Sequence, residues 1–132
     1  MTLRPLPVPP GAGGYLAFDK EAGQPAHGPG GLLEEARAAL GPDLHLVHRL
    51  DRITSGVLLL ARGEEALRAA HAAWPTQVTK LYVGLVRGVP SAPEGTIDLP
   101  LLEHRTGRPW LLERALRAAY GPDRAARLLR GE

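Results

Sequence analysis

The 132-residue sequence predicts an α+β fold in which helices cover a sheet. Apolar residues recur at helical spacing in residues 32–40 and 64–74, which indicates two amphipathic helices. Residues 57–61 form a short apolar run, and residues 78–87 alternate between apolar and other side chains, so both stretches are typical of strands. The length is that of one ordinary domain, which can bury a core of its own.

Turn and breaker residues separate these elements. Residues 1–14 are rich in Pro and Gly and predict an extended leader, so order is expected to begin near Tyr15 with a short strand. Gly41 and Pro42 should stop the first helix, and Pro75 should end the second. The run at 57–61 is too short for a stable helix and is expected to be a strand buried on both faces.

Composition excludes several classes of protein. There is no cysteine, which rules out disulfides, thiolate chemistry and zinc ribbons. No apolar run approaches the roughly 18 residues of a membrane span, and the N-terminus does not look like a secretory signal, so the protein is expected to be cytoplasmic. The absence of Asn and the two Lys against fourteen Arg fit either a thermophilic source or a GC-rich genome.

Charge is distributed unevenly. The net charge is only +2, but residues 104–132 carry seven Arg against three acidic residues. Two short helices are expected there, over residues 110–120 and 122–130. An arginine-rich tail of this kind could neutralise RNA phosphates, and it could equally be a solvated helix surface.

The most informative stretch places a carboxylate, Asp51, between Arg49 and Arg52 in a loop that leads into the strand at 57–61. Nearby positive charge favours the ionised form, and an ionised Asp can act as a nucleophile or base. The alternative is a surface ion pair. His45, His48 and Asp51 could also form the metal site of a small hydrolase, but three-residue spacing suits a helix face and the intervening residues show no helical pattern.

The string HRLDRITSGVLLLAR, residues 48–62, resembles the signature of the RluA-class pseudouridine synthases. Residues 16–27 are similar to the opening strand and turn of that family, and residues 80–88 to its K-x-Y strand. The resemblance covers about residues 15–102, between the leader (1–14) and an Arg-rich helical tail (103–132). It implies a mixed, mainly antiparallel sheet with covering helices, similar to the N-terminal half of the family's catalytic domain.

The resemblance also implies a function, the isomerisation of uridine to pseudouridine in rRNA or tRNA without cofactor or metal. Asp51 would be the catalytic carboxylate, and Tyr82 would stack on the base or take the C5 proton. Arg49 would fill the space that the extruded base leaves. The remaining residues implied at the substrate or RNA-binding site are Arg52, Lys20, His48 and Lys80.

The match stops near residue 102, and the family's G-R-T-H-Q-[IL]-R motif, whose arginine is expected to pair with the catalytic aspartate, does not occur in this sequence. A catalytically degenerate RNA-binding module of the same fold is therefore the alternative. Half of a sheet would leave an unpaired edge strand, which makes a homodimer through that edge a further expectation.

Overall fold

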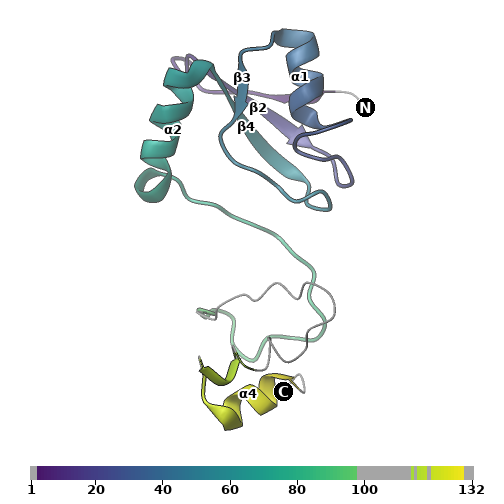
Figure 1. The fold of residues 1–132 in the computed structure, drawn as a ribbon, viewed down its shortest axis with the longest axis vertical. Helices are drawn as coiled ribbons and strands as arrows, with labels where there is room; N and C mark the ends of the chain where they lie inside the picture. The colour runs from purple at the N-terminus through teal and green to yellow at the C-terminus, as the bar shows by residue number, and fades with distance from the viewer. Residues whose placement is uncertain (1–2, 98–113, 115, 119, 130–132) are drawn as a thin grey trace. The chain divides into compact units, whose positions relative to one another are not determined.

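The computed structural model describes residues 3–97, 114, 116–118 and 120–129. These residues fall into two units, Met1–Val83 and Gly84–Glu132. The first unit is a four-stranded antiparallel sheet with two helices, which confirms the predicted α+β class (Figure 1). Its elements are β1 (Pro5–Leu6), β2 (Tyr15–Lys20), α1 (Leu32–Leu40), β3 (Leu44–Leu46), β4 (Gly56–Arg62) and α2 (Gly63–Gln77).

The strand order is β1-β2-β4-β3, so β4 has a neighbour on each side. Alternate residues of β4 point to opposite faces. On one face Leu58 and Leu60 pack with Phe18 of β2 against the apolar side of α1. As predicted, α1 spans residues 32–40 and ends before Gly41, whose φ of 112° suits glycine. This layer forms the main core of the unit.

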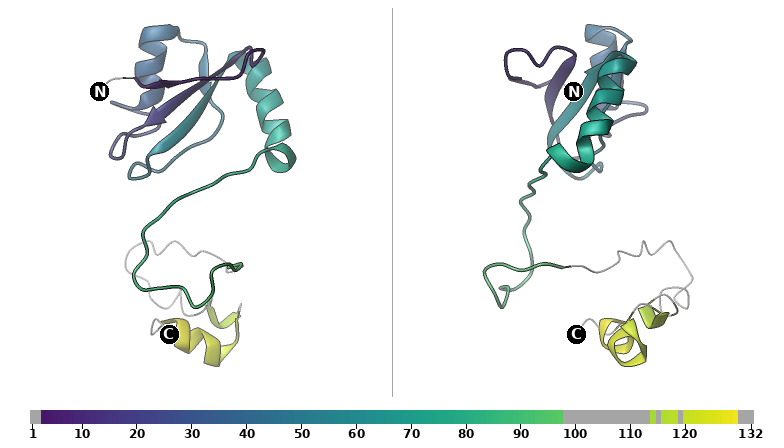
Figure 2. Two further views of the ribbon diagram at one scale, coloured as in Figure 1. Left: turned by 180° about the vertical axis from the view of Figure 1, so that it is seen from behind. Right: turned by 90° about the vertical axis from the view of Figure 1, so that its left-hand side faces the viewer.

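The second face of the sheet is covered by α2, which lies away from α1 in the views of Figure 2. Ala61 and Leu59 of β4 pack there against Ala70 and Trp74 of α2. Val57, at the start of β4, remains 58% exposed. The expectation that residues 57–61 are buried on both faces is therefore wrong at the beginning of the strand, because no described element covers Val57.

Two predicted boundaries need correction. The sheet begins before Tyr15, because Pro5 and Leu6 pair with Phe18 and Ala17 as the short edge strand β1. Helix α2 does not end at Pro75 but continues to Gln77. A proline this close to the end removes only one backbone donor from the last turn, which explains why the helix tolerates it.

The predicted strand at 78–87 is absent: these residues lie in no helix and no sheet of the described chain. A strand needs a neighbour to receive its backbone hydrogen bonds, and none lies beside this segment in the described part.

The second unit contains α4 (Pro122–Leu129), close to the predicted helix at 122–130, and helical backbone at residues 114, 116–118 and 120. Ala125 is buried, and the Arg124 guanidinium lies 5.4 Å from the centre of the Tyr120 ring. The start of the predicted helix at 110–120 lies outside the described residues. No helix in the described part of the chain is both long and apolar enough to cross a membrane.

Candidate active site

Two loops meet at the end of the sheet where β2 stops and β4 starts, since Lys20 pairs with Gly56 there. One is the turn at residues 21–24, and the other carries Asp51. Gly23 donates its backbone N–H to the carbonyl of Arg52 at 2.7 Å, and Arg52 Nε donates back to the Gly23 carbonyl at 2.9 Å. Gly23 has a φ of 92°, which favours glycine at this contact. The loop carrying Asp51 is thus fastened to the turn by a reciprocal pair of hydrogen bonds.

Lys20 lies fully buried beneath these loops. Its Nζ donates to the carbonyls of Glu21 (3.0 Å), Gln24 (2.8 Å) and Arg52 (3.2 Å), which uses all three donors of the ammonium group. Burial lowers the pKa of Lys20, and the negative charge of Asp51 acts in the opposite direction. Lys20 therefore joins the two loops from below and places a positive charge near Asp51.

Asp51 itself is exposed, and its carbonyl accepts the N–H of Thr54 at 3.0 Å in a tight turn. Within the described residues no ion pair joins Asp51 to Arg49 or to Arg52. The sequence suggested that these two arginines flank the carboxylate, whereas Arg52 Nε is directed to the turn at 21–24 and the buried Lys20 is the cation whose charge acts with that of Asp51. Asp51 is left accessible to a substrate.

Two histidines shape the chain just before Asp51. Val47 donates its N–H to the carbonyl of Leu59 at 3.1 Å, as in a continuation of the β3–β4 ladder. The N–H of Leu59, however, donates to Nε2 of His48 at 3.1 Å, and the carbonyl of Val47 lies 3.0 Å from Nε2 of His71 in α2. In a continued ladder the N–H of Leu59 would donate to the carbonyl of Val47. Here the His48 ring replaces the acceptor and the His71 ring replaces the donor, so β3 ends and the chain turns away into the Asp51 loop.

The hydrogen-bond partners of the two imidazole rings define which ring nitrogen carries the proton. Because an N–H points at Nε2 of His48, that nitrogen must be an acceptor, whereas Nε2 of His71 must donate to a carbonyl. Burial lowers the pKa of His48, the charge of Lys80 lowers it further, and a hydrogen bond with the backbone of Arg49 opposes both. The environment thus favours the neutral ring that the Leu59 contact requires.

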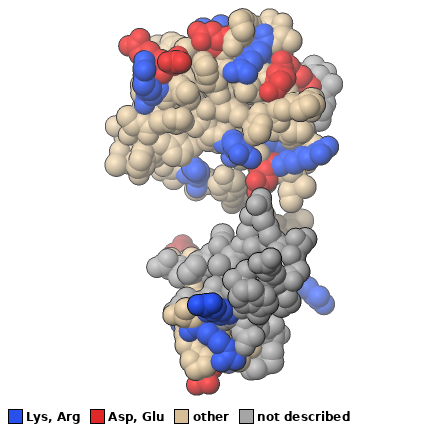
Figure 3. Space-filling view, viewed as in Figure 1, with Lys and Arg blue, Asp and Glu red and all other residues tan. Residues whose placement is uncertain are grey.

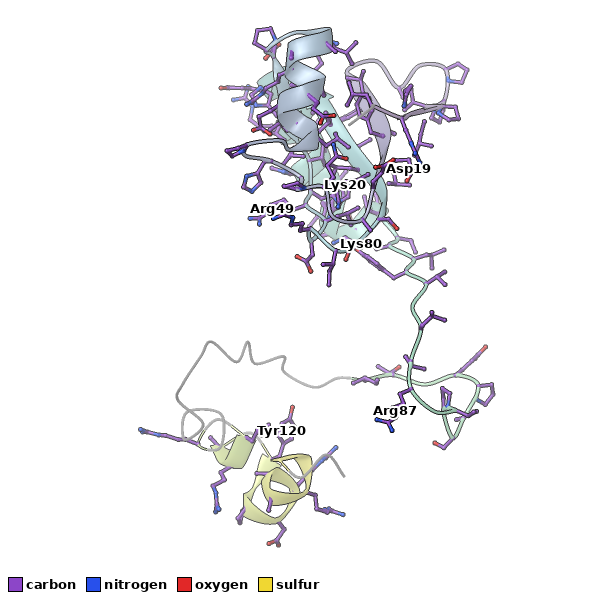
Figure 4. The ribbon with its side chains drawn as sticks, turned by 90° about the vertical axis from the view of Figure 1, so that its right-hand side faces the viewer. Asp19, Lys20, Arg49, Lys80, Arg87 and Tyr120 are labelled. Atoms are coloured by element: carbon purple, nitrogen blue, oxygen red, sulfur yellow. The ribbon has the colours of Figure 1, made fainter. Side chains whose placement is uncertain are left out.

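Trp74 of α2 supports His48. The two rings stack with centroids 5.0 Å apart and an angle of 29° between their planes, and Nζ of Lys80 lies 5.2 Å from the Trp74 ring. Figure 4 shows Lys20, Arg49 and Lys80 at one end of the first unit. Four of the residues named from the sequence, Lys20, His48, Arg49 and Arg52, are therefore close to Asp51 in the two loops or directly beneath them, and Lys80 is linked to them through Trp74.

In the described structure no contact brings Tyr82 to this site. Its side chain is 65% exposed, and in the described structure it makes no hydrogen bond and no ring contact. The metal-site alternative is not supported either: His45 Nε2 lies 3.3 Å from Asp43, Nε2 of His48 is occupied by Leu59, and no group of three potential metal ligands occurs in the described residues.

Sequence reasoning did not assign a role to His71 or Trp74, nor to Tyr15, whose hydroxyl donates to the carbonyl of Ala66 in α2 at 2.9 Å. His71 and Trp74 lie on the apolar side of a predicted helix. A histidine on an apolar helix side indicates a buried polar contact, and this pattern could have pointed to His71. On the face of the first unit that Figure 3 shows, basic and acidic side chains are interspersed. The surface charge alone would not have located the site.

Comparison with known proteins identifies the family. Residues 14–124 match the model of the RNA pseudouridylate synthase family. The chain is 44% identical over 96 residues to ribosomal large subunit pseudouridine synthase C of Haemophilus ducreyi, an alignment that covers 67% of this chain and 30% of that protein. It is 38% identical over 107 residues to the mitochondrial pseudouridylate synthase RPUSD4 of Xenopus tropicalis, covering 71% of this chain and 33% of that protein.

Among solved structures, the human RNA pseudouridylate synthase domain containing 4 matches 48% of this chain and 27% of its own, with 30% identity and a TM-score of 0.39. The chain thus spans about a third of the length of the curated relatives that it matches. The family model, which matches more than half of the chain, shows that this chain belongs to the RNA pseudouridylate synthase family.

Proposed function

We propose that this chain is an RNA pseudouridine synthase in which Asp51 is the catalytic carboxylate. The observation that carries the proposal is the combination of exposure and restraint at Asp51. The side chain is open to solvent, while hydrogen bonds from Lys20, Gly23 and Thr54 hold the backbone on which it stands. A rigidly held, accessible carboxylate is what a substrate-attacking group needs.

The chemistry requires few groups. The bond from N1 of uracil to C1′ of the ribose breaks, the base turns, and C5 forms the new bond to C1′. C5 then loses its proton, and N1 takes up a proton in its place. Atoms and electrons balance without an oxidant, and one carboxylate acting as nucleophile or base can serve the reaction. Tyr82 is proposed to stack on the base, which requires the 78–87 segment to become ordered beside the site.

The other proposed residues divide by their contacts. Arg49 is exposed, and within the described residues its side chain donates no hydrogen bond, so it is free to contact RNA or to fill the space of an extruded base. Lys80 is exposed beside Trp74 and is suited to a phosphate contact. Lys20, His48 and Arg52 are proposed to act at the site mainly by holding the loop, since their polar atoms bind backbone groups.

We further propose that the substrate is ribosomal or transfer RNA, that the protein acts in the cytoplasm, and that two copies associate through an exposed strand edge. The names of the bacterial relatives, which are synthases of the large ribosomal subunit, favour ribosomal RNA.

The test measures tritium release from ribosomal and transfer RNA transcripts that carry uridine labelled at C5. The wild type is compared with Asp51→Asn and with the control Asp19→Asn, which removes a carboxylate from β2 in the same unit. Release by the wild type and the control, but not by Asp51→Asn, is the expected result. Filter binding of the same RNAs is measured in parallel. RNA binding without release from any protein would instead identify a degenerate RNA-binding module.

A further inference from the structure

The last rung of the β3–β4 ladder is the pair Val47–Leu59, and one of its two hydrogen bonds is divided between histidine side chains. The register places Val47 opposite Leu59, one step beyond the last β3 pair. Opposite residues of a hydrogen-bonded antiparallel pair exchange two backbone bonds. The bond from Val47 N–H to the Leu59 carbonyl is made at 3.1 Å. The second bond is replaced by the contacts of His48 and His71.

The ladder stops although β4 continues. β2 pairs with residues 56–61 of β4, whereas β3 pairs with residues 60–62. Beyond Leu59, residues 56–58 have no strand neighbour on the β3 side in the described part of the chain. A strand edge with free backbone groups favours continued pairing. The chain is therefore held away from β4 at this point by contacts other than backbone pairing.

The direction of the His48 side chain shows what these contacts are. Successive side chains of a strand point to opposite faces. Val47 packs on the α2 side of the sheet, so His48 would point to the α1 side if β3 continued. Its ring instead stacks on Trp74 of α2, with the centroids 5.0 Å apart. Two successive side chains thus lie on the α2 side, and the His48 ring takes the place of a strand carbonyl against Leu59.

We propose that His48 and His71 are positioning residues that hold the last rung open, and that protonation of His48 closes the rung and withdraws the Asp51 loop. In the closed form the N–H of Leu59 donates directly to the carbonyl of Val47. The inference rests on the proposed function, because it takes Asp51 as the reacting carboxylate. It adds a pH-sensitive control of where that carboxylate stands.

The two histidines respond differently to protonation. A neutral imidazole has one accepting and one donating nitrogen, whereas the protonated ring has two donors. His71 donates to the carbonyl of Val47 from Nε2, and it keeps this donor in either form. Protonated His48 has no acceptor left, so its Nε2–H meets the N–H of Leu59. The carbonyl of Val47 is then the acceptor that the register offers to Leu59.

Closing the rung displaces the start of the Asp51 loop. The carbonyl of Val47 belongs to the peptide that joins it to His48, so turning this carbonyl toward β4 rotates the peptide. The other end of the loop is fixed at Arg52, whose carbonyl accepts from Lys20 and from the turn at residues 21–24. The displacement therefore falls on residues 48–51. A shift of about 1 Å in a catalytic group can cost about a hundredfold in rate.

The surroundings of His48 set the pH range of the switch. Burial lowers the pKa of His48, the charge of Lys80 lowers it further, and the backbone hydrogen bond with Arg49 opposes both. The rung should therefore close below the ordinary histidine pKa of about 6.5.

The other titratable side chains around His48 have interactions of their own. They come from α2, β3 and the loop, and they are His71, which binds the Val47 carbonyl, His45, which pairs with Asp43, and Asp51, whose charge acts with that of Lys20. The β4 residue beside the ring is Leu59, which does not titrate. Within the described residues no ion pair includes His48. Protonation of His48 is therefore the event that changes the hydrogen bonding of the rung.

Scalar couplings across hydrogen bonds test the rung in the full chain by nuclear magnetic resonance. Above the titration midpoint of the His48 ring, the amide nitrogen of Leu59 should couple to Nε2 of His48. Below the midpoint, this coupling should disappear and a coupling from Leu59 to the carbonyl carbon of Val47 should appear. The amide signal of Asp51 should shift with the same midpoint.

Two results would overturn the closed rung. One is a Leu59 amide that exchanges freely with water once His48 is protonated, because its hydrogen bond would then be lost rather than passed to Val47. The other is a His48 ring that stays neutral down to the pH at which the chain unfolds. Both are read from the wild type, so the test does not depend on a variant that folds.

Tritium release from C5-labelled RNA measures the consequence for catalysis. At saturating RNA the wild-type kcat should fall by about tenfold per pH unit below the His48 midpoint, as the titration of one group requires. His48→Gln can accept the N–H of Leu59 through its side-chain oxygen and does not titrate, so it should lack this fall. The matched control His45→Gln removes the histidine of β3 that pairs with Asp43 and should keep it.

The two arms separate the failure of this inference from the failure of the proposed function. A wild-type pH profile in His48→Gln would refute the link between the rung and Asp51. If the wild type releases no tritium at any pH, the proposed function fails. The couplings of Leu59 and the shift of the Asp51 amide then still decide whether the rung controls the loop.

Discussion

Nε2 of His48 accepts the backbone N–H of Leu59, in the position that a strand carbonyl would occupy if β3 continued. The carbonyl of Val47, which would accept this N–H in a continued strand, accepts a hydrogen bond from His71 instead. The β3–β4 ladder therefore ends with its backbone groups satisfied, although the two strands separate. The separation frees residues 48–55 to form the loop that presents Asp51, so a side-chain contact within the sheet determines where the candidate catalytic carboxylate stands.

The His48 contact predicts a pH dependence of stability. Burial and Lys80 lower the pKa of His48 in the folded protein, whereas in the unfolded chain it titrates near the ordinary value of about 6.5. Between these two pKa values the unfolded state binds more protons, so the free energy of unfolding falls as the pH drops below about 6.5, by at most about 1.4 kcal/mol per pH unit. Above pH 7 the stabilisation is complete.

Urea denaturation at pH 7 and pH 5 measures this effect, with His48→Gln as the control. Glutamine can accept a hydrogen bond through its carbonyl oxygen but does not titrate, and all other ionisable groups are common to both proteins. The wild type should lose more stability than His48→Gln between the two pH values. Equal losses would show that His48 does not carry the pH dependence.

Substitution of Lys20 should lower the stability of the fold substantially, although the sequence suggests this residue as an RNA contact. Lys20→Met keeps most of the volume but leaves the carbonyls of Glu21, Gln24 and Arg52 without their donor. Leaving buried polar groups unpaired costs about 1–3 kcal/mol, and we expect a loss of that size in the free energy of unfolding. Chemical denaturation at neutral pH provides the measurement.

The matched control for Lys20 is Lys80→Met, which removes an exposed lysine that lies over the Trp74 ring. Its effect on stability should be below about 1 kcal/mol. If Lys20→Met were as stable as Lys80→Met, Lys20 would not be holding the two loops together.

The sequence predicted what depends on local pattern. Helix α1 shows helical spacing and a terminal glycine, and the pattern predicts it to the residue. The position of Asp51 in the loop before β4 follows from a polar stretch that precedes an apolar run. The resemblance to the synthase family, which the comparisons confirm, also rested on local strings. These features need only neighbours within a few residues.

The errors arise where partners are distant in sequence. β1 was missed because Pro5 and Leu6 become a strand only by pairing with Phe18 and Ala17. The strand at 78–87 was wrongly predicted because alternation gives a face pattern but no hydrogen-bonding partner. The burial of Lys20 could not be seen from residue type, since a lysine is rarely fully buried, and the three carbonyls that make it possible belong to two separate loops.

The hydrogen bond from His71 of α2 to the carbonyl of Val47 should stabilise the end of β3. His71→Leu removes the donor to the carbonyl of Val47 and should lower the free energy of unfolding by about 0.5–1.5 kcal/mol, since His71 is exposed and water can reach the bond. His71→Gln, which can donate through its side-chain amide, should recover part of this loss. Thermal denaturation of the three proteins provides the comparison, and a leucine variant as stable as the wild type would argue against the contact.

Substitutions of Arg49 and Arg52 should have opposite effects on stability and RNA affinity, although the two residues lie only three positions apart. Arg52 binds the carbonyl of Gly23, so Arg52→Ala should destabilise the fold by about 0.5–1.5 kcal/mol and weaken any activity through a looser loop. Arg49 makes no such bond in the described structure, so Arg49→Ala should change stability by less than about 0.5 kcal/mol while it lowers RNA affinity in low salt. Denaturation and filter binding of the two variants separate these roles. If Arg49→Ala lost stability and kept RNA affinity, the division between a holding and a binding arginine would be reversed.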